Sequence, residues 1–335
     1  MKAVRLYGVG DVRLGEEDAP AAGPGEVLLK VTSVGLCGSD LHWFSEAGIG
    51  DAQLARPLVL GHEFAAVALE GNRKGKRVAV DPAVVCGRCR FCLEGNPNFC
   101  LSHRFAGHGE QDGALREMVA WPEANLFPLP EALSDADGAM LELLGVAIHA
   151  VDLAHLRAGM RVGVFGCGPI GLLIVQVARL AGATQVVATD AMPHRVEKAR
   201  SVGATEAFLA CRGEEVAQIQ AATKGEGVDV AFEVAGDNAA VETAVAAVRP
   251  GARVVLIGIP SDDRTGFQAS VARRKGLTFL LCRRMKHTYP RAIQLVEKGL
   301  VDVRSLVTHR FAIEDYAQAF STAVKREGLK IVIEP

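Results

Sequence analysis

The chain has 335 residues, of which 37 are Lys or Arg and 39 are Asp or Glu, so its formal net charge is −2. Hydrophobic residues make up 49% and charged residues 23%, which is typical of a globular protein and excludes a disordered one. Near-neutral charge gives the whole chain no attraction for nucleic acid or an anionic membrane. A single core rarely grows to this length, so we expect two domains.

The chain up to about residue 140 consists of short apolar, β-like runs. Examples are 27–31 and 77–80, and clusters of Gly, Pro and Asp separate them. This pattern predicts an irregular, mostly β domain. Charged residues at positions 2 and 5 interrupt any apolar leader, which favours a cytoplasmic protein.

Four cysteines fall within fifteen residues of this first part, at Cys86, Cys89, Cys92 and Cys100. Four thiolates fill a tetrahedral coordination shell, which is typical of a structural zinc site without an open position. An iron–sulfur cluster would need a different last spacing and commonly a Cys-Pro pair, whereas Cys100 is followed by Leu101. We therefore expect zinc to organise a lobe that is poor in apolar residues.

From Arg161 onward, apolar strand-like runs alternate with helical patterns. The expected strands are 162–165, 185–189, 228–234, 253–257 and 277–281, and the expected helices are 172–181 and 195–201. This alternation predicts a doubly wound parallel sheet. Two later helices, 290–298 and 314–324, and a final strand, 330–333, are expected to return to the first domain.

A glycine-rich turn joins the first of these strands to its helix. It contains Gly166, Gly168, Pro169, Ile170 and Gly171. The first glycine permits the turn, the second admits a pyrophosphate close to the backbone, and the third lets helix and strand pack closely. The free N–H groups of the following helix would face the phosphates, so this turn predicts a dinucleotide site.

Asp190 ends the next strand, at the place where an acid commonly holds the ribose hydroxyls of the cofactor. Its carboxylate would accept a hydrogen bond from the 2′-hydroxyl of NAD and repel the 2′-phosphate of NADP. Arg195, on the following helix, is expected to lie against the adenine or solvent. The sequence therefore favours NAD.

A second, dispersed cluster contains Cys37 and the pair His62-Glu63. A thiolate, an imidazole and one carboxylate would bind zinc and leave one position for substrate. Spacing alone leaves the alternative open that Cys37 and His62 are ordinary structural residues.

The whole chain resembles the zinc-dependent medium-chain dehydrogenases, most closely their sorbitol/xylitol (polyol) dehydrogenase branch. The matching motifs are Cys37-Gly38-Ser39-Asp40-Leu41-His42, Gly61-His62-Glu63, the four-cysteine lobe, the glycine-rich turn, the segment 142–150 and the segment 306–311. The resemblance implies a GroES-like, mostly β catalytic domain, residues 1–144 and 284–335, and a Rossmann NAD-binding domain, residues 145–283.

The resemblance also implies roles for single residues. Cys37, His62 and Glu63 would bind a catalytic zinc, and Glu142 would bind it directly or through its water. Asp40 would orient the His62 ring. Ser39 and His42 would relay a proton toward solvent, so the implied catalytic residues are Ser39, His42, Glu63 and Glu142.

Two departures from the branch concern the substrate pocket. Trp43 stands where Tyr is common, and it cannot accept a hydrogen bond. Arg284 matches the substrate-binding Arg of the branch, but Met285 replaces the usual aromatic hydroxyl beside it. We therefore expect a pocket that is more apolar than a typical polyol pocket, with Trp43 and Arg284 in contact with substrate.

These patterns predict a zinc- and NAD-dependent dehydrogenase of a secondary alcohol, such as the polyols sorbitol or xylitol. The alternatives are a dehydrogenase of a sugar, a threonine-like or a simple secondary alcohol, a zinc-free reductase, and a non-catalytic NAD-binding relative. The basic residues between 273 and 286 lack interleaved aromatics, which favours a solvated or subunit-facing surface over nucleic acid. By analogy with the branch we expect a dimer or tetramer, with 277–281 as the candidate edge strand.

Overall fold

The structure, a computed structural model, describes residues 1–211 and 213–335. Contacts divide the chain into two compact units. The first unit comprises Met1–Glu142, Tyr289–Gly299 and Val303–Pro335, and the second comprises Leu143–Thr288 and Leu300–Asp302. Most of the C-terminal part of the chain thus contacts the N-terminal unit, whereas Leu300–Asp302 group with the second unit.

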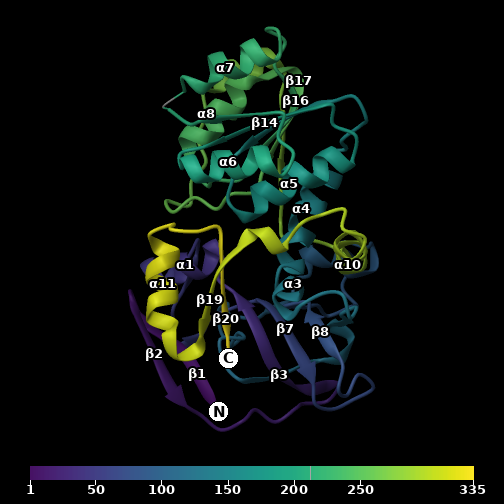
Figure 1. Cartoon of the computed structure of the whole chain (residues 1–335), viewed down its shortest axis with the longest axis vertical. Coiled ribbons are helices and arrows are strands. Elements are labelled where there is room, and N and C mark those ends of the chain that lie inside the picture. The colour runs from purple at the N-terminus through teal and green to yellow at the C-terminus, as the bar shows by residue number, and fades with distance from the viewer. Residues whose placement is uncertain (212) are drawn as a thin grey trace. The chain divides into compact units, whose positions relative to one another are not determined.

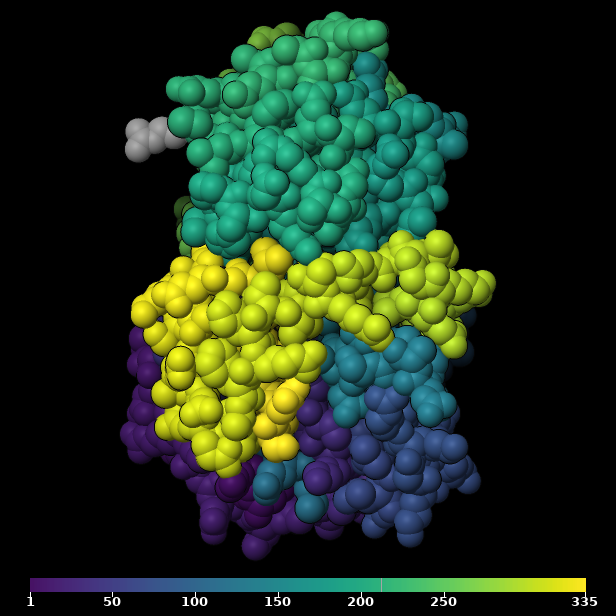
Figure 2. All heavy atoms as spheres, viewed as in Figure 1, coloured from purple at the N-terminus to yellow at the C-terminus, as the bar shows by residue number. Residues whose placement is uncertain are grey.

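The main sheet of the first unit is mixed and joins strands from both ends of the chain (Figure 1). Its strand order is β12 (Leu126–Pro128), β8 (Arg77–Val80), β7 (Glu63–Ala68), β3 (Glu26–Gly35), β20 (Lys330–Glu334) and β19 (Val307–Ala312), and β11 (Met118–Pro122) also pairs with β3. The last strand, β20, runs antiparallel to β3, with Val332 opposite Gly35. Figure 2 shows the C-terminal segment, in yellow, lying against the N-terminal strands, in purple, on this unit.

Smaller elements complete the first unit. They are a sheet of β2 (Asp11–Glu16), β1 (Lys2–Gly8) and β6 (Leu58–Val59), the pairs β4 (Gly48–Ile49) with β5 (Ala52–Gln53) and β9 (Ala83–Val84) with β10 (Arg104–Phe105), and the helices α1 (Gly38–Glu46), α2 (Arg90–Leu93), α3 (Asp135–Ala139), α10 (Tyr289–Glu297) and α11 (Tyr316–Val324). Four short 3₁₀ turns, Pro97–Phe99, Glu123–Asn125, Arg304–Leu306 and Ile313–Asp315, lie in its loops. The irregular, mostly β architecture that the short apolar runs predicted is therefore present.

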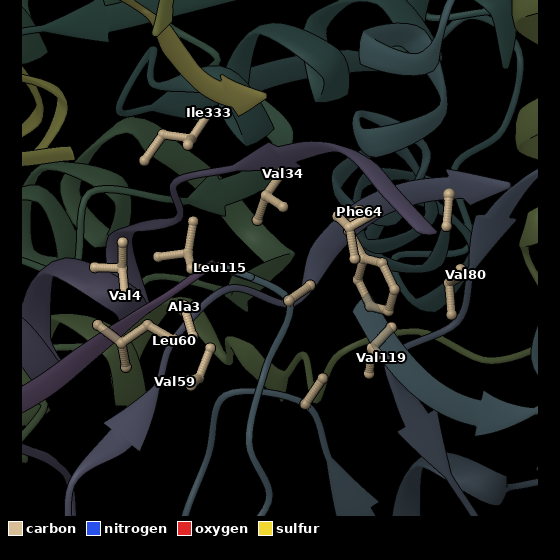
Figure 3. Packing of buried hydrophobic residues seen from close by; sticks show 14 of the residues in the cluster. Ala3, Val4, Val34, Val59, Leu60, Phe64, Val80, Leu115, Val119 and Ile333 are labelled. Atoms are coloured by element: carbon tan, nitrogen blue, oxygen red, sulfur yellow. The ribbon is translucent and has the colours of Figure 1, made fainter. Parts of the chain in front are cut away.

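The core of the first unit fills the space between these strands. Figure 3 shows Phe64, Val80 and Val119 packed together, with Val34 and Ile333 nearby. The rings of Phe64 and Trp121 meet edge to face, with centroids 6.3 Å apart. Successive residues of a strand face opposite sides of the sheet, and β7 is buried on both sides. Its sequence after Glu63 is therefore a continuous run of apolar residues. Glu63 is therefore a polar residue at the start of an apolar strand.

The second unit is built on one parallel sheet. Its order is β15 (Glu206–Leu209), β14 (Gln185–Asp190), β13 (Arg161–Phe165), β16 (Val228–Glu233), β17 (Val248–Leu256) and β18 (Thr278–Leu281), and every pair is parallel. The order reverses between β13 and β16, as in the doubly wound dinucleotide-binding fold. The predicted strand near 277–281 is the edge strand β18.

The helices of this unit are α4 (Leu141–Leu153), α5 (Pro169–Leu180), α6 (Pro193–Ser201), α7 (Glu215–Ala222), α8 (Asn238–Ala247) and α9 (Ala269–Lys275). Both α5 and α6 begin at a proline, two or three residues before the predicted start, because the fixed φ of proline suits the first helical turn. The sequence patterns did not predict β15, α7, α8 and α9, whose short or alanine-rich segments carry a weak periodic signal.

One basic residue that was expected to face solvent or a partner has an internal role. The ammonium group of Lys275 donates hydrogen bonds to the carbonyl oxygens of Val245, Ala246 and Val248, at 2.9, 2.7 and 2.7 Å. These carbonyls lie at the end of α8, where helical oxygens lack partners within the helix. Lys275 therefore closes that helix.

Among the described residues, no helix combines the length and apolar character that a membrane crossing requires.

Candidate active site

The structure brings together Cys37, His62 and Glu63, three of the expected ligands of the catalytic metal. Their potential ligand atoms all lie within 4.8 Å of one another. Cys37 precedes α1, and His62 and Glu63 stand where β7 begins, so two segments 25 positions apart in the sequence meet. Sulfur, nitrogen and oxygen donors at this separation suit zinc.

Asp40 holds these two segments together. One of its carboxylate oxygens accepts a hydrogen bond from the backbone N–H of Cys37 (2.9 Å), and the other accepts one from the N–H of Gly61 (3.1 Å). The second oxygen also lies 3.5 Å from Nδ1 of His62. Since Asp40 is only 1% exposed, these contacts fix the segments that carry Cys37 and His62.

Charge within this cluster shifts two pKa values. Burial alone would raise the pKa of Asp40, but attraction to His62 and hydrogen bonds from Cys37 and Gly61 leave that pKa below its usual value. Burial alone would lower the pKa of His62, yet Asp40 and Cys37 raise it well above its usual value. Protonation of His62 therefore competes with metal binding at this nitrogen donor.

The approach to His62 depends on a glycine. Gly61 has φ 91°, a left-handed conformation that other residues rarely adopt. A β-carbon there would lie 2.8 Å from Cγ1 of Val34 and 3.0 Å from Cγ of Leu115. The motif Gly61-His62-Glu63 thus has a steric as well as a chemical basis.

Glu63 is fully buried, and its carboxylate is held by an ion pair and not by a hydrogen bond within the described residues. Within the described part of the chain neither oxygen takes part in an aligned hydrogen bond, although Oε2 forms an ion pair with Nζ of Lys330. A buried carboxylate normally satisfies its oxygens. A metal ion beside Cys37 and His62 would do so, and the residues therefore fit a zinc ion.

Glu142 lies in the first turn of α4 and is 5% exposed. Burial is the largest cause and raises its pKa to about 7, because it outweighs the attraction of His62 and Lys330, and repulsion from Glu63 adds to the rise. The structure places Glu142 near the cluster but does not include it among the ligand atoms within 4.8 Å. Direct or water-mediated ligation by Glu142 stays a prediction.

Ser39 and His42 are three residues apart on α1, so they share one face of that helix. Both are half-buried, and Nδ1 of His42 lies 3.2 Å from Oε1 of the exposed Glu46. This arrangement gives a polar path from α1 to solvent. The predicted relay through Ser39 and His42 is compatible with it and stays a prediction.

Trp43, on the same helix, is 1% exposed and belongs to the core of the first unit. Its ring meets that of His108 edge to face, with centroids 5.4 Å apart. Arg284 has φ 50° and is half-buried. Substrate contacts by Trp43 and Arg284 stay predictions.

Met285 is buried over α4. A β-carbon at Gly145 would lie 2.7 Å from Oγ1 of Thr288 and would overlap Sδ of Met285, so the glycine makes room for both side chains. The Thr288 hydroxyl lies 3.1 Å from that sulfur. Met285 therefore fills a space inside the second unit.

The four cysteines Cys86, Cys89, Cys92 and Cys100 form a second potential metal cluster. Backbone N–H groups of Cys86 and Cys89 donate to Sγ of Cys100 and Cys86, both at 3.3 Å. The N–H of Cys92 lowers the pKa of Cys89 to about 6, whereas burial raises the pKa of Cys92 to about 12. A four-thiolate site of this kind fits a structural zinc.

The glycine-rich turn has the geometry that a dinucleotide requires. Gly166 has φ 105°, and a β-carbon there would lie 2.7 Å from the N of Ala235. A β-carbon at Gly171 would overlap the carbonyl oxygen of Gly166. At Gly168, by contrast, the nearest atom would be Nη1 of Arg195 at 4.0 Å, which leaves the backbone open to a phosphate.

Pro169 and Ile170 begin α5 beside this opening, and both are half-buried. Asp190 stands at the end of β14, where its oxygens accept hydrogen bonds from the N–H of Cys167 (2.7 Å) and of Met192 (2.8 Å). Asp190 is thereby fixed next to the glycine-rich turn. Its contact with a ribose, like that of Arg195 with an adenine, stays a prediction.

Sequence reasoning missed Lys330, which contacts Glu63. Lys330 is 2% exposed within the strand Lys-Ile-Val-Ile. A lysine in a short apolar strand at the C-terminus was the available signal, because a buried lysine requires a partner.

Comparisons with known proteins agree with this geometry. Residues 23–131 match the protein-family model for the alcohol dehydrogenase GroES-like domain, and residues 169–298 match the family model for zinc-binding dehydrogenase. The sorbitol dehydrogenase of Bacillus subtilis (strain 168) is 34% identical, with 100% of this chain and 97% of that protein covered.

Two similar solved structures contain a nicotinamide cofactor. A putative zinc-binding dehydrogenase from Sinorhizobium meliloti 1021 bound to NADP has a TM-score of 0.91 and 31% identity, and the match covers 100% of this chain and 99% of that one. An alcohol dehydrogenase from E. coli CFT073 complexed with NADH has a TM-score of 0.91 and 30% identity, with the same coverage.

The chain therefore belongs to the zinc-binding dehydrogenase family, whose GroES-like and Rossmann parts match the two units described above. Within that family it is of the sorbitol/xylitol dehydrogenase branch, as the sequence motifs predicted. It is a zinc-dependent oxidoreductase that uses a nicotinamide cofactor and acts on a small-molecule alcohol.

Proposed function

We propose that the chain oxidises a secondary hydroxyl of a polyol, such as sorbitol or xylitol, with NAD as hydride acceptor. The observation that carries this proposal is the buried cluster of Cys37, His62 and Glu63, tied by Asp40 and matched to relatives named sorbitol dehydrogenase. Residues 1–144 and 284–335 would form the catalytic domain and residues 145–283 the cofactor domain.

Cys37, His62 and Glu63 would hold the catalytic zinc, and Glu142 would bind it directly or through its water. A bound zinc would supply Lewis acidity that lowers the pKa of the substrate hydroxyl. The Asp40 carboxylate, which lies next to Nδ1 of His62, would hold the His62 ring in the orientation that binds the metal. The four cysteines of the lobe would hold a second, structural zinc.

Proton removal from the substrate hydroxyl is assigned to side chains of α1 and α4. Ser39 would accept the proton, and His42 would pass it toward Glu46 and solvent. Glu142 would act in the same region, directly at the zinc or through its water. Trp43 and Arg284 would contact the substrate, Arg284 through its hydroxyls and Trp43 through its apolar ring.

The cofactor preference rests on Asp190. Its fixed carboxylate favours a 2′-hydroxyl over a 2′-phosphate, and neither Ala191 nor Met192 offers a cation. Gly166, Gly168, Pro169, Ile170 and Gly171 would carry the pyrophosphate, with Arg195 beside it. NAD is therefore proposed over NADP.

The test is NADH formation across sorbitol, xylitol, related sugar alcohols, threonine and simple secondary alcohols, with NADP in parallel. Rapid turnover of a polyol with NAD is the expected result. Turnover of only the apolar alcohols would refute the polyol assignment and retain the reaction type. Replacing Asp190 by Ala should reduce the ratio of kcat/KM for NAD over NADP by roughly tenfold or more, because one charge-assisted contact is lost.

We also propose a homo-oligomer, dimer or tetramer, in the cytoplasm. The sheet edge β18 offers unpaired backbone groups and an exposed Leu281, which favours pairing with another copy. Eight cysteines are free, and thiolate metal sites suit a reducing compartment. Sedimentation of a monomer at micromolar concentration would contradict the assembly.

A further inference from the structure

Glu233 ends strand β16, at the point where the strand order of the parallel sheet reverses. The residue is buried, and its Oε1 accepts hydrogen bonds from the backbone N–H groups of Ala235 and Gly236, both at 2.8 Å. Its backbone carbonyl oxygen accepts two more, from the N–H groups of Ile257 (2.9 Å) and Gly258 (3.2 Å). Glu233 therefore joins the turn that follows its own strand to the loop that follows β17.

Three segments pack closely around this residue, and glycines permit the contacts. A β-carbon at Gly166 would lie 2.7 Å from the backbone N of Ala235. A β-carbon at Gly258 would overlap the backbone N of Gly236 and would lie 2.9 Å from Oε2 of Glu233. The turn after Glu233 is therefore in contact with the glycine-rich turn and with the loop after β17.

The topology of the sheet indicates which part of the cofactor these segments would meet. A doubly wound sheet consists of two mononucleotide-binding halves, and a dinucleotide crosses the carboxyl ends of its strands where their order reverses. Asp190, at the end of β14, lies in the half that would take the adenosine. Strands β16 and β17 belong to the other half, so we expect residues 234–236 and 257–258 at the nicotinamide end. Glu233 holds both of these segments.

A carboxylate is a costly group to bury at this place, and hydrogen bonds offset that cost. Burial raises the pKa of Glu233, and hydrogen bonds from the N–H groups of Gly236, Ala235 and Asp237 oppose the rise. An apolar side chain of similar size would fill the space without this cost, but it would leave these N–H groups without their acceptor. The carboxylate is therefore suited to ordering the turn and not only to filling space.

We propose that Glu233 is a positioning residue for the nicotinamide half of the cofactor. Because it holds residues 234–236 and 257–258, that half of the site is formed before the cofactor binds, and the cofactor does not have to order these segments itself. Binding of the adenosine at Asp190 does not require Glu233. This inference rests on the proposed preference for NAD, since it takes the two halves of NAD to bind in this arrangement.

The first experiment compares the wild type with Glu233→Leu, which removes the acceptor and retains most of the side-chain volume. Calorimetry on the full chain measures the dissociation constants of NADH, which spans both halves, and of ADP-ribose, which lacks the nicotinamide. We expect the dissociation constant of NADH to rise about tenfold or more in Glu233→Leu, because the cofactor must then order the two segments. The dissociation constant of ADP-ribose should stay within about threefold of the wild-type value.

Two further variants separate this role from a general contribution to folding. Glu233→Gln keeps the oxygen that accepts both N–H groups of the turn, so its NADH affinity should stay within about threefold of the wild type. Glu215→Leu removes another buried carboxylate of the second unit, which accepts hydrogen bonds from the N–H groups of Cys211 (2.9 Å) and Gly213 (3.1 Å) after β15. It should lower the thermal midpoint and leave the ratio of the two dissociation constants unchanged.

The results distinguish a positioning role from a structural one. A parallel rise of both dissociation constants in Glu233→Leu would overturn the inference. A lower thermal midpoint with unchanged NADH affinity would overturn it as well, since Glu233 would then serve folding alone.

If Glu233→Leu does not fold, Gly258→Ala decides, because its β-carbon would force the loop after β17 away from the turn after Glu233. Weaker binding of NADH with unchanged binding of ADP-ribose would then support the inference, and any other pattern would overturn it. A wild type that binds neither ligand would instead contradict the proposed preference for NAD.

Discussion

The two candidate metal sites of this chain are assembled in opposite ways. In the cysteine lobe, Cys86 to Cys100 supply every ligand from one short loop region, and neighbouring Leu93 and Leu101 are largely exposed. In the cluster of Cys37, His62 and Glu63, two separate segments meet inside the first unit, and a buried Asp40 joins them. With the structural zinc proposed above, the lobe would depend on its metal for a core, whereas the buried cluster lies in a unit that has an apolar core of its own.

This difference shows two kinds of metal site. In the first kind the metal is required for folding, and in the second kind the metal binds to a fold that is stable without it. The first kind fails by local unfolding when a ligand is lost. The second kind fails by loss of chemistry while the surrounding sheet persists. Four substitutions test whether the two sites follow this division.

Cys100→Ser should have the largest effect, because it removes a ligand from the site that organises the lobe. We expect limited proteolysis between residues 84 and 104 to become at least about 100-fold faster, since structural zinc contributes on the order of 10 kcal/mol to small zinc-dependent folds. Mass spectrometry of the fragments locates the cut. An intact lobe with one zinc fewer would contradict a fold-forming role.

His62→Ala should abolish turnover and leave the fold intact. We expect kcat/KM to fall by roughly 10³-fold or more, because the activated oxygen loses its metal. Circular dichroism and the protease sensitivity of residues 84–104 should match the wild type. Unfolding of the first unit would show that the buried cluster, like the lobe, needs its metal.

Glu142→Gln should change the pH dependence of stability in metal-depleted protein. Burial raises the folded-state pKa of Glu142 to about 7, whereas the ordinary value is 4.5. The unfolded chain therefore ionises first, and stability falls as pH rises from about 4.5 to about 7, by at most about 3 kcal/mol. Urea unfolding at pH 5 and pH 8 should show this loss in the wild type and a smaller one in Glu142→Gln.

Equal pH dependence in the two proteins would show that Glu142 titrates normally. Zinc-loaded protein is the matched control, because a nearby divalent cation favours the ionised carboxylate and should reduce the difference between the variants.

Asp40→Asn should have the smallest effect of the four. The amide keeps the size of the side chain but loses the charge that faces His62, so zinc affinity should fall roughly 10- to 100-fold. Competition with a chelator of known affinity measures this change. A loss of thermal stability without a change in zinc affinity would assign Asp40 to holding Cys37 and Gly61 only.

The sequence predicted the features that depend on local patterns. The four cysteines, the strand–turn–helix around Gly166 to Gly171, and the acid Asp190 each follow from spacing and neighbouring residues, and the structure has the corresponding elements. The return of the C-terminal segment was also expected, and β20 pairs with β3. Short-range geometry is encoded in adjacent residues, so it can be inferred from them.

Features that depend on contacts across the sheet were not accessible in this way. The meeting of Cys37 with His62 came from the family resemblance, because the register of β3 against β7 is not visible in one sequence. The contact between Lys330 and Glu63 was missed, since it needs three strands and the absence of a side chain at Gly35. The raised pKa of Glu142 likewise depends on burial, which spacing does not report.

The hydrogen bonds of Asp40 also have a consequence for evolution. They join residues 37 and 61 through protein atoms alone, so hydrogen bonds within the protein help to offset the entropy lost on closing that stretch of chain. A lineage can then change one metal ligand, or alter the affinity for the metal, without first losing the domain that carries the site. New specificities would therefore be more accessible at this centre than in the cysteine lobe, whose proposed structural zinc would need every ligand for folding.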